Sequence, residues 1–155
     1  MAESQLVRQR LAEAALALPD RPAALGDYVP AVRSGSLVFT SGQLPMSDGS
    51  LMERGVVGRD VGLDRARLCA AQCALNALAA ASTVCDLDEV VRVVKVTGYV
   101  ASADGFIAQP AVVDGASELL LIAFAEAGRH ARAAVGVAAL PLGAPVEVEI
   151  VLELA

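Results

Sequence analysis

Nine residues near the C-terminus, from Val146 to Leu154, alternate between apolar and mostly acidic side chains. The apolar set is Val146, Val148, Ile150, Leu152 and Leu154, and the set between them is Glu147, Glu149, Val151 and Glu153. Successive side chains of a β-strand point to opposite faces of the sheet. The stretch therefore predicts a strand with one face on a hydrophobic core and a second, acidic face.

The rest of the chain divides into helical and strand-like segments, without an internal repeat, a low-complexity tail or a linker. Helices are expected at residues 5–18, 61–82 and 111–127, and further strands at 37–40, 89–100 and 133–138. Asp60 or Asp64 is expected to cap the second helix, and Gly128 to end the third. A chain of 155 residues with this order of elements is predicted to form one α+β domain, in which helices pack on a sheet.

The strand expected at 133–138 also has two different faces. Val135 and Val137 lie on one, and Arg132, Ala134, Gly136 and Ala138 on the other. Both C-terminal strands are thus expected to have a core face and a second face that is small or acidic. A face of Ala and Gly lets another backbone or a ligand approach closely. The alternative interpretation is a solvent face with an ordinary Arg–Glu pair, which contributes little to stability.

Composition argues against nucleic-acid and membrane functions. The net charge is −6, whereas nucleic-acid binders need a basic surface to neutralise phosphates. No apolar run reaches the roughly 18 residues of a membrane span, and the N-terminus lacks the pattern of a signal peptide, so a cytoplasmic location is expected. Apolar residues make up 55% and charged residues 19% of the chain, which suggests that further surface is buried in an oligomer.

The cysteines and the single histidine predict no metal site. Cys69, Cys73 and Cys85 are an odd number of thiols without secretory cues, which is typical of reduced, buried side chains. One histidine is too few for the usual zinc ligand sets. His130 itself is expected to be a surface or capping histidine rather than a general base.

Three short motifs stand at family-specific spacings. The C-terminal one reads ARAAVGV at 131–137, then Ala139-Leu140-Pro141, then VEVE at 146–149. The others are TSGQLP at 40–45 and Tyr28-Val29-Pro30 after Gly26. From about Tyr28 to the C-terminus the chain resembles the YjgF/RidA family of reactive-intermediate deaminases, whose members are also called L-PSP endoribonucleases or translation inhibitors.

The resemblance implies a fold similar to that of the AroH-type chorismate mutases, a sheet backed by two long helices. It also implies a homotrimer whose sheets enclose a central barrel, with ligand sites in the clefts between subunits. Residues 1–155 would then form a single domain of this family, in which residues 1–20 contribute an extra N-terminal helix.

The resemblance further implies hydrolysis of small 2-imino or 2-enamino acids to 2-keto acids and ammonia. Arg132 would grip the substrate carboxylate with its planar fork, and Glu147 would activate or orient the attacking water. The backbone at Gly42 and Ala134 would line the cleft, and Tyr28 would supply a phenol at its edge. No metal or organic cofactor is expected, because an imine carbon is already electrophilic.

Two positions depart from the family pattern. Ala134 stands where several members carry cysteine, which excludes a role for a thiol there. Asp114 stands where shorter members have asparagine near the cleft, and the wall from 106 to 128 is expected to decide the substrate. Alternatives are a non-catalytic trimer that binds small carboxylates, an endoribonuclease, against which the acidic charge argues, and, by fold analogy alone, a chorismate mutase.

Overall fold

A computed structural model describes residues 5–23 and 26–155 of the chain. The helices are α1 (Gln5–Glu13), α2 (Leu63–Ala81) and α3 (Gln109–Phe124), and single 3-10 turns lie at Leu87–Glu89, Ala125–Gly128 and Pro141–Gly143. The strands are β1 (Ala31–Ser34), β2 (Leu37–Thr40), β3 (Met46–Ser47), β4 (Ser50–Leu51), β5 (Val90–Ala101), β6 (Ala131–Val137) and β7 (Val146–Leu154).

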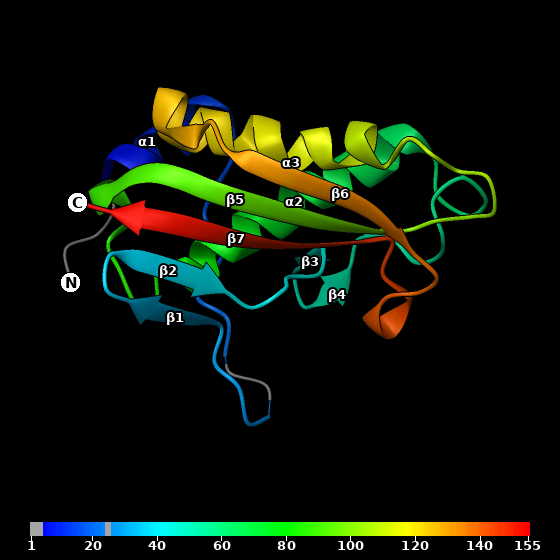
Figure 1. Cartoon of the computed structure of the whole chain (residues 1–155), viewed down its shortest axis with the longest axis horizontal. Coiled ribbons are helices and arrows are strands. Elements are labelled where there is room, and N and C mark those ends of the chain that lie inside the picture. Colours follow the sequence, from blue (N-terminus) through cyan, green and yellow to red (C-terminus); the bar gives the residue numbers. More distant parts are fainter. Residues whose placement is uncertain (1–4, 24–25) are drawn as a thin grey trace.

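Five of the strands form one mixed sheet in the order β1-β2-β7-β5-β6. Strands β5 and β6 are parallel, and the other neighbours are antiparallel. The long helices α2 and α3 pack together on one face of this sheet, and β3 and β4 form a separate small hairpin (Figure 1). The predicted α+β architecture, a sheet backed by two long helices, is confirmed.

The alternation in β7 positions the core. All five of its apolar side chains on the even-numbered positions are buried, and the residues between them are half-buried. The buried side chains meet small residues of α2, including Cys69, Cys73 and Ala77. Because α2 is rich in alanine, it can approach the sheet closely, and this accounts for a well-filled core with few aromatic residues.

The N-terminal helix is shorter than predicted. It ends at Glu13 rather than at residue 18, because Ala15 takes a left-handed conformation (φ 59°) and the residues after it form no helix. The first described turn is tied to the domain by Asp88, whose carboxylate accepts the backbone N–H groups of Leu6 and Val7 at 2.9 and 3.0 Å. A carboxylate there also complements the positive end of the helix dipole. Residues 1–4, which the sequence places in the same extra segment, lie outside the described residues.

The predicted N-terminal cap of α2 and the predicted C-terminal end of α3 were both wrong. Helix α2 begins after Gly62 without a side-chain cap, and Asp64 lies inside its first turn. Asp60 instead accepts the N–H of Val56 in the preceding loop. Helix α3 ends at Phe124 and is followed by Ala125 at a positive φ (52°), and Gly128 lies in the 3-10 turn that Ala125 begins. A Cβ on Gly128 would collide with the Leu120 carbonyl, so the glycine allows close packing rather than a helix cap.

The sequence did not predict β1 or the β3–β4 hairpin. Strand β1 has one buried residue among four, so its pattern alone is too weak to indicate a strand. Pairing with β2 across the turn at Gly35 (φ 61°) stabilises it instead. The hairpin turns at Asp48 and Gly49, both of which have positive φ.

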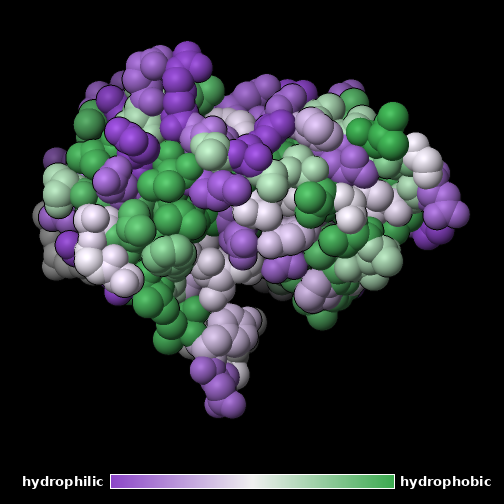
Figure 2. All heavy atoms as spheres, in the orientation of Figure 1, coloured by the Kyte–Doolittle hydropathy of each residue, from purple (hydrophilic) through white to green (hydrophobic). Residues whose placement is uncertain are grey.

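Within the described residues, no helix covers the second face of the sheet, which we call the open face. It carries apolar side chains that are substantially exposed, among them Val32, Phe39 and Val135. The acidic side of β7 belongs to the same face. Figure 2, viewed from this side, shows hydrophobic residues gathered beside hydrophilic ones on the surface.

Candidate functional site

Arg132 lies on edge strand β6 and points towards the helices. It is in register with Val96, which is fully buried beneath the helix layer, and paired residues of adjacent parallel strands share a face. Its Nη1 donates to Asp114 Oδ1 at 2.8 Å and to Ser117 Oγ at 3.2 Å, and its Nη2 donates to the Pro110 carbonyl at 3.3 Å. Helix α3 therefore supplies all the described partners of this guanidinium.

His130 extends this group by two hydrogen bonds. Its Nδ1 lies 2.6 Å from the Gly128 carbonyl and its Nε2 lies 2.8 Å from Ser117 Oγ. A carbonyl can only accept, so Nδ1 carries the proton, and in the neutral ring Nε2 accepts from the serine hydroxyl. Ser117 oxygen is then left to accept from Arg132. We call Arg132, Asp114, Ser117 and His130 the arginine cluster.

Ala134 lies on the same face of β6 as Arg132, as predicted, but this face packs on the helices instead of being the second face. It is in register with Gly98 and packs against the core. A Cβ on Gly98 would collide with Val113 of α3, so this face lies under the helix. Val135, expected on the core side, is 41% exposed on the open face. Small residues are therefore needed here because α3 packs closely on β5 and β6.

Glu147 points to the open face of the sheet. It is in register with Tyr99 of β5, whereas its neighbours Val146 and Val148 point into the core. Burial raises the pKa of the Glu147 carboxyl, and the like charge of Glu149 raises it further. A Cβ on Gly42 would collide with the Glu147 carboxylate, so a larger residue in the loop after β2 would have to displace that side chain.

Tyr28 and Gly42 share a pocket of about 180 Å³ beside this glutamate. Pro30, Leu44 and Leu142 form other parts of its wall, and the Tyr28 side chain is largely exposed at the surface. We call Tyr28, Gly42 and Glu147 the glutamate cluster. Gly42 joins the two parts of this cluster, because it lines the pocket with Tyr28 and lies against the Glu147 carboxylate.

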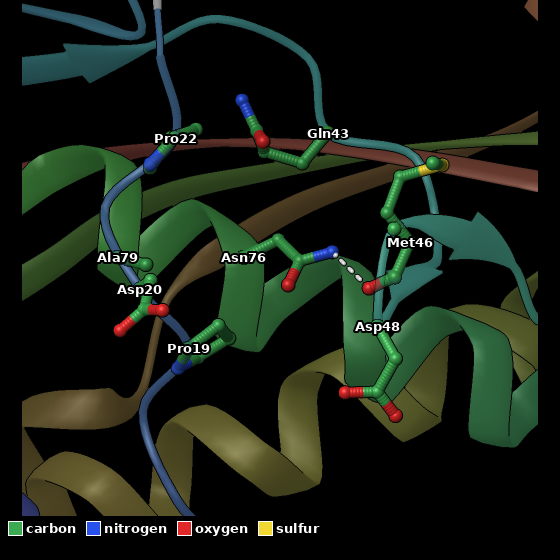
Figure 3. Close-up of a pocket in the computed structure, with 9 residues that line it drawn as sticks. Pro19, Asp20, Pro22, Gln43, Met46, Asp48, Asn76 and Ala79 are labelled. Atoms are coloured by element: carbon green, nitrogen blue, oxygen red, sulfur yellow. Dashed lines mark hydrogen bonds between the residues drawn. The ribbon is translucent and has the colours of Figure 1, made fainter.

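A larger cavity of about 420 Å³ adjoins this pocket, and the two share Pro22, Gln43 and Met46 (Figure 3). It lies between α2, the segment that follows α1 and the β3–β4 hairpin. Asn76 of α2 lines this cavity, and its side-chain amide donates to the carbonyls of Leu44 and Met46 at 2.9 and 3.0 Å. The loop that carries Gly42 is thus anchored to the helix layer.

The two clusters do not meet within one chain. Arg132 points to the helix side and Glu147 to the open face, and strand β5 separates the strands that carry them. The structure brings Asp114 to Arg132, and Gly42 to Glu147. The expected partnership of Arg132 with Glu147 therefore requires residues from two copies of the chain.

Sequence reasoning missed Ser117, and it predicted a capping role for His130 but not the contact between the two. The histidine does make a capping contact with Gly128, but it is half-buried rather than at the surface, and it contacts Ser117. For both residues, the spacing in the sequence could have predicted the contact. Ser117 follows Asp114 by three residues on a helix, which places the two on one face. His130 precedes Arg132 by two residues in an extended segment, which also places them on one face.

The described residues provide neither a metal site nor a reactive cysteine. No group of three or more histidine, cysteine or acidic side chains there is arranged to hold a metal ion. The three cysteines are free and buried, and burial raises the pKa of Cys69 and of Cys85 to about 11, which is unsuited to a nucleophile. No helix in the described part of the chain is long and apolar enough to cross a membrane.

Comparison with known proteins places this arrangement in a family. The model of the family described as "YjgF/chorismate_mutase-like, putative endoribonuclease" matches residues 8–154. The chain is also 41% identical over 150 residues to protein TCP17 of Trypanosoma cruzi, covering 96% of this chain and 94% of that protein. The chain therefore belongs to the YjgF family, as its motifs predicted.

Solved structures agree with this assignment. A protein of unknown function from Agrobacterium tumefaciens, Atu1372, is 43% identical with a TM-score of 0.89, covering 98% of this chain and 94% of that one. A "putative endoribonuclease" from Shewanella oneidensis is 35% identical with a TM-score of 0.91, covering 96% and 99%. Escherichia coli TdcF, solved with bound serine, is 26% identical with a TM-score of 0.59, covering 86% and 93%.

Proposed function

We propose that this protein hydrolyses small 2-imino or 2-enamino acids to 2-keto acids and ammonia, at sites shared between the subunits of a homotrimer. The observation that carries the proposal is the split between the clusters. A cation suited to a carboxylate and a carboxylate suited to proton transfer lie on opposite faces of one sheet. Each is half of a site that a second copy would complete.

The chemistry needs only these two groups and water. Arg132 binds the substrate carboxylate through a charge-assisted pair of hydrogen bonds. Glu147 accepts a proton from water while the water oxygen attacks the C=N carbon. The carbon–nitrogen bond then breaks, the nitrogen leaves as ammonia with the transferred protons, and the carbonyl oxygen of the 2-keto acid comes from water. The raised pKa of the Glu147 carboxyl brings it closer to the operating pH, which suits a general base.

A cyclic trimer would bring the clusters together. Contacts between two different surfaces of identical subunits generate a closed ring when the rotation allows closure. The edge strand β6 with its arginine cluster would face the glutamate cluster of the next subunit. The exposed apolar side chains of the open face would then be buried inside the ring. The serine bound to TdcF supports a small carboxylate-bearing ligand for this family.

Imine hydrolysis tests the proposal directly. An amino acid oxidase would generate 2-imino acids from a panel of amino acids, and semicarbazide would trap the imine that remains. We expect wild-type protein to accelerate imine loss, and Arg132→Ala and Arg132→Lys to lose most of this effect. Arg129→Ala is the matched control, because Arg129 makes only an exposed ion pair with Glu126 on the same segment.

The alternative functions predict other results. A trimer that only binds carboxylates would bind serine through Arg132 without accelerating hydrolysis of any imine. An endoribonuclease would cleave RNA in a salt-sensitive, Arg132-dependent way, which a net charge of −6 disfavours. We also propose a cytoplasmic location, because the three free thiols are suited to a reducing compartment.

A further inference from the structure

Asp114 gives the arginine cluster its own charge balance. We infer that Asp114 makes this cluster select a zwitterion, with a cationic nitrogen next to its carboxylate, over a simple carboxylate anion. The class selected is the 2-iminium acid, together with the 2-amino acids that share its charges. The class disfavoured is the 2-oxo acid that hydrolysis would release. The inference rests on the proposed function, because it takes Arg132 as the carboxylate-binding group.

The hydrogen bonds of Arg132 leave one side of the guanidinium available. Of its five N–H donors, Nη1 uses two, on Asp114 and Ser117, and Nη2 uses one, on Pro110. Nε and the second N–H of Nη2 have no partner among residues 5–23 and 26–155. A ligand carboxylate can therefore bind this edge without displacing Asp114.

Asp114 remains accessible at Nη1 of the same guanidinium. Its side chain is 45% exposed, against 24% for Arg132, and only its Oδ1 is engaged by the guanidinium. The neighbouring acid on α3, Glu118, is paired with Arg67 at 2.7 Å and belongs to the α2–α3 surface. Asp114 is thus the carboxylate that a ligand bound to Arg132 would meet on α3.

The two charges of the pair cancel, so the cluster offers a dipole rather than a net positive charge. A zwitterion can place its carboxylate on Arg132 and its cationic nitrogen towards Asp114. A 2-oxo acid gains the first contact but has no cation to offset the repulsion between its own carboxylate and Asp114, and juxtaposed like charges oppose binding. Asp114 would therefore favour the substrate and promote release of the product.

Two ligands that differ only at the second carbon test this inference. L-Serine carries an ammonium group there, and 3-hydroxypyruvate carries a ketone. Calorimetry would measure both dissociation constants for wild-type protein, Asp114→Asn, Asp114→Glu and Arg132→Ala. The control is Glu118→Gln, which makes the same change of charge four residues further along α3.

We expect wild-type protein to bind serine more tightly than 3-hydroxypyruvate. Asp114→Asn should shift the ratio of the two constants by about tenfold towards the anion, while Asp114→Glu and Glu118→Gln keep the wild-type preference. An unchanged ratio in Asp114→Asn, with both ligands still dependent on Arg132, overturns the inference and leaves the proposed function standing. Absence of Arg132-dependent binding of either ligand overturns both.

Discussion

At the scale of single residues, the contact between Gly42 and Glu147 sets the chemistry of the glutamate cluster. The loop lies against the carboxylate so closely that no side chain fits between them. This approach removes water from the carboxylate, and burial is the main reason that its pKa is raised. Glycine at position 42 therefore allows this close approach, and a larger residue there would displace the Glu147 side chain.

The raised pKa of Glu147 predicts how stability depends on pH. The folded chain holds this proton to a higher pH than the unfolded chain, so stability falls as pH rises from the usual glutamate value through the raised one. Glu147→Gln should therefore increase Tm at pH 7, by less than about 4 °C. The gain should shrink as pH falls towards about 4, where the wild-type carboxyl is protonated too. A lower Tm for the variant at pH 7 would contradict this account.

Ser117 and His130 are predicted to position Arg132 rather than to contact substrate. Ser117→Ala removes one acceptor from the guanidinium, and we expect KM for the imine to rise about fivefold with little change in kcat. Ser117→Thr keeps the hydroxyl and should restore most of the wild-type KM. If threonine and alanine have the same effect, the hydroxyl does not hold Arg132.

At the scale of elements, the packing of α3 explains why several positions on it and beneath it are small. A Cβ on Gly115 would collide with the Arg67 carbonyl of α2, and a Cβ on Gly98 of β5 would collide with Val113 of α3. These contacts fix α3 between α2 and the sheet. They thereby determine where Asp114 and Ser117 stand relative to β6.

Gly115→Ala is therefore predicted to destabilise the fold. The added methyl group meets backbone, which cannot move away cheaply, and overpacking of this kind typically costs about 1–3 kcal/mol. Urea unfolding followed by circular dichroism would measure the change. Gly62→Ala is the control, since a Cβ there meets nothing within 4 Å, and it should destabilise the fold less than Gly115→Ala. Equal stability of the two variants would contradict the packing account.

How far the sequence predicts each element depends on how its residues are buried. The alternation in β7 and the valine-rich run in β5 are strong local signals, and both strands lie close to where they were expected. Strand β1 has no such signal, because pairing with β2 stabilises it. The alternating pattern around Arg132 and around Glu147 correctly predicts that both residues lie on strands. It does not reveal that they lie on opposite faces, since that depends on the register with β5.

At the scale of the whole molecule, the open face is the feature that a single chain leaves unexplained. Exposed Val32 and Phe39 lie on it with half-buried acidic residues of β7. Apolar groups on one face of a sheet are normally covered. A ring of subunits would cover them, and it would also join the two clusters.

A charge placed on the open face should therefore disrupt the assembly. We expect wild-type protein to have about three times the 15.8 kDa mass of one chain in size-exclusion chromatography with light scattering. Phe39→Asp should lower this mass, because it would bury a further carboxylate among acidic neighbours. Leu68→Asp on the outer surface of α2, where Leu68 is 55% exposed, should leave the mass unchanged. A monomeric wild-type protein would contradict the trimer.

Complementation between two inactive variants tests the shared site most directly. Arg132→Ala and Glu147→Gln chains would be co-expressed with different tags, and the mixed oligomers would be purified through both and assayed for imine hydrolysis. If each site takes Arg132 from one subunit and Glu147 from the next, every trimer that contains both variants has about one intact site in three. We therefore predict that mixed oligomers regain about a third of wild-type activity, while each variant alone stays inactive. Mixed oligomers that remain as inactive as the single variants, alongside active wild-type protein, would show that the site is not shared between chains.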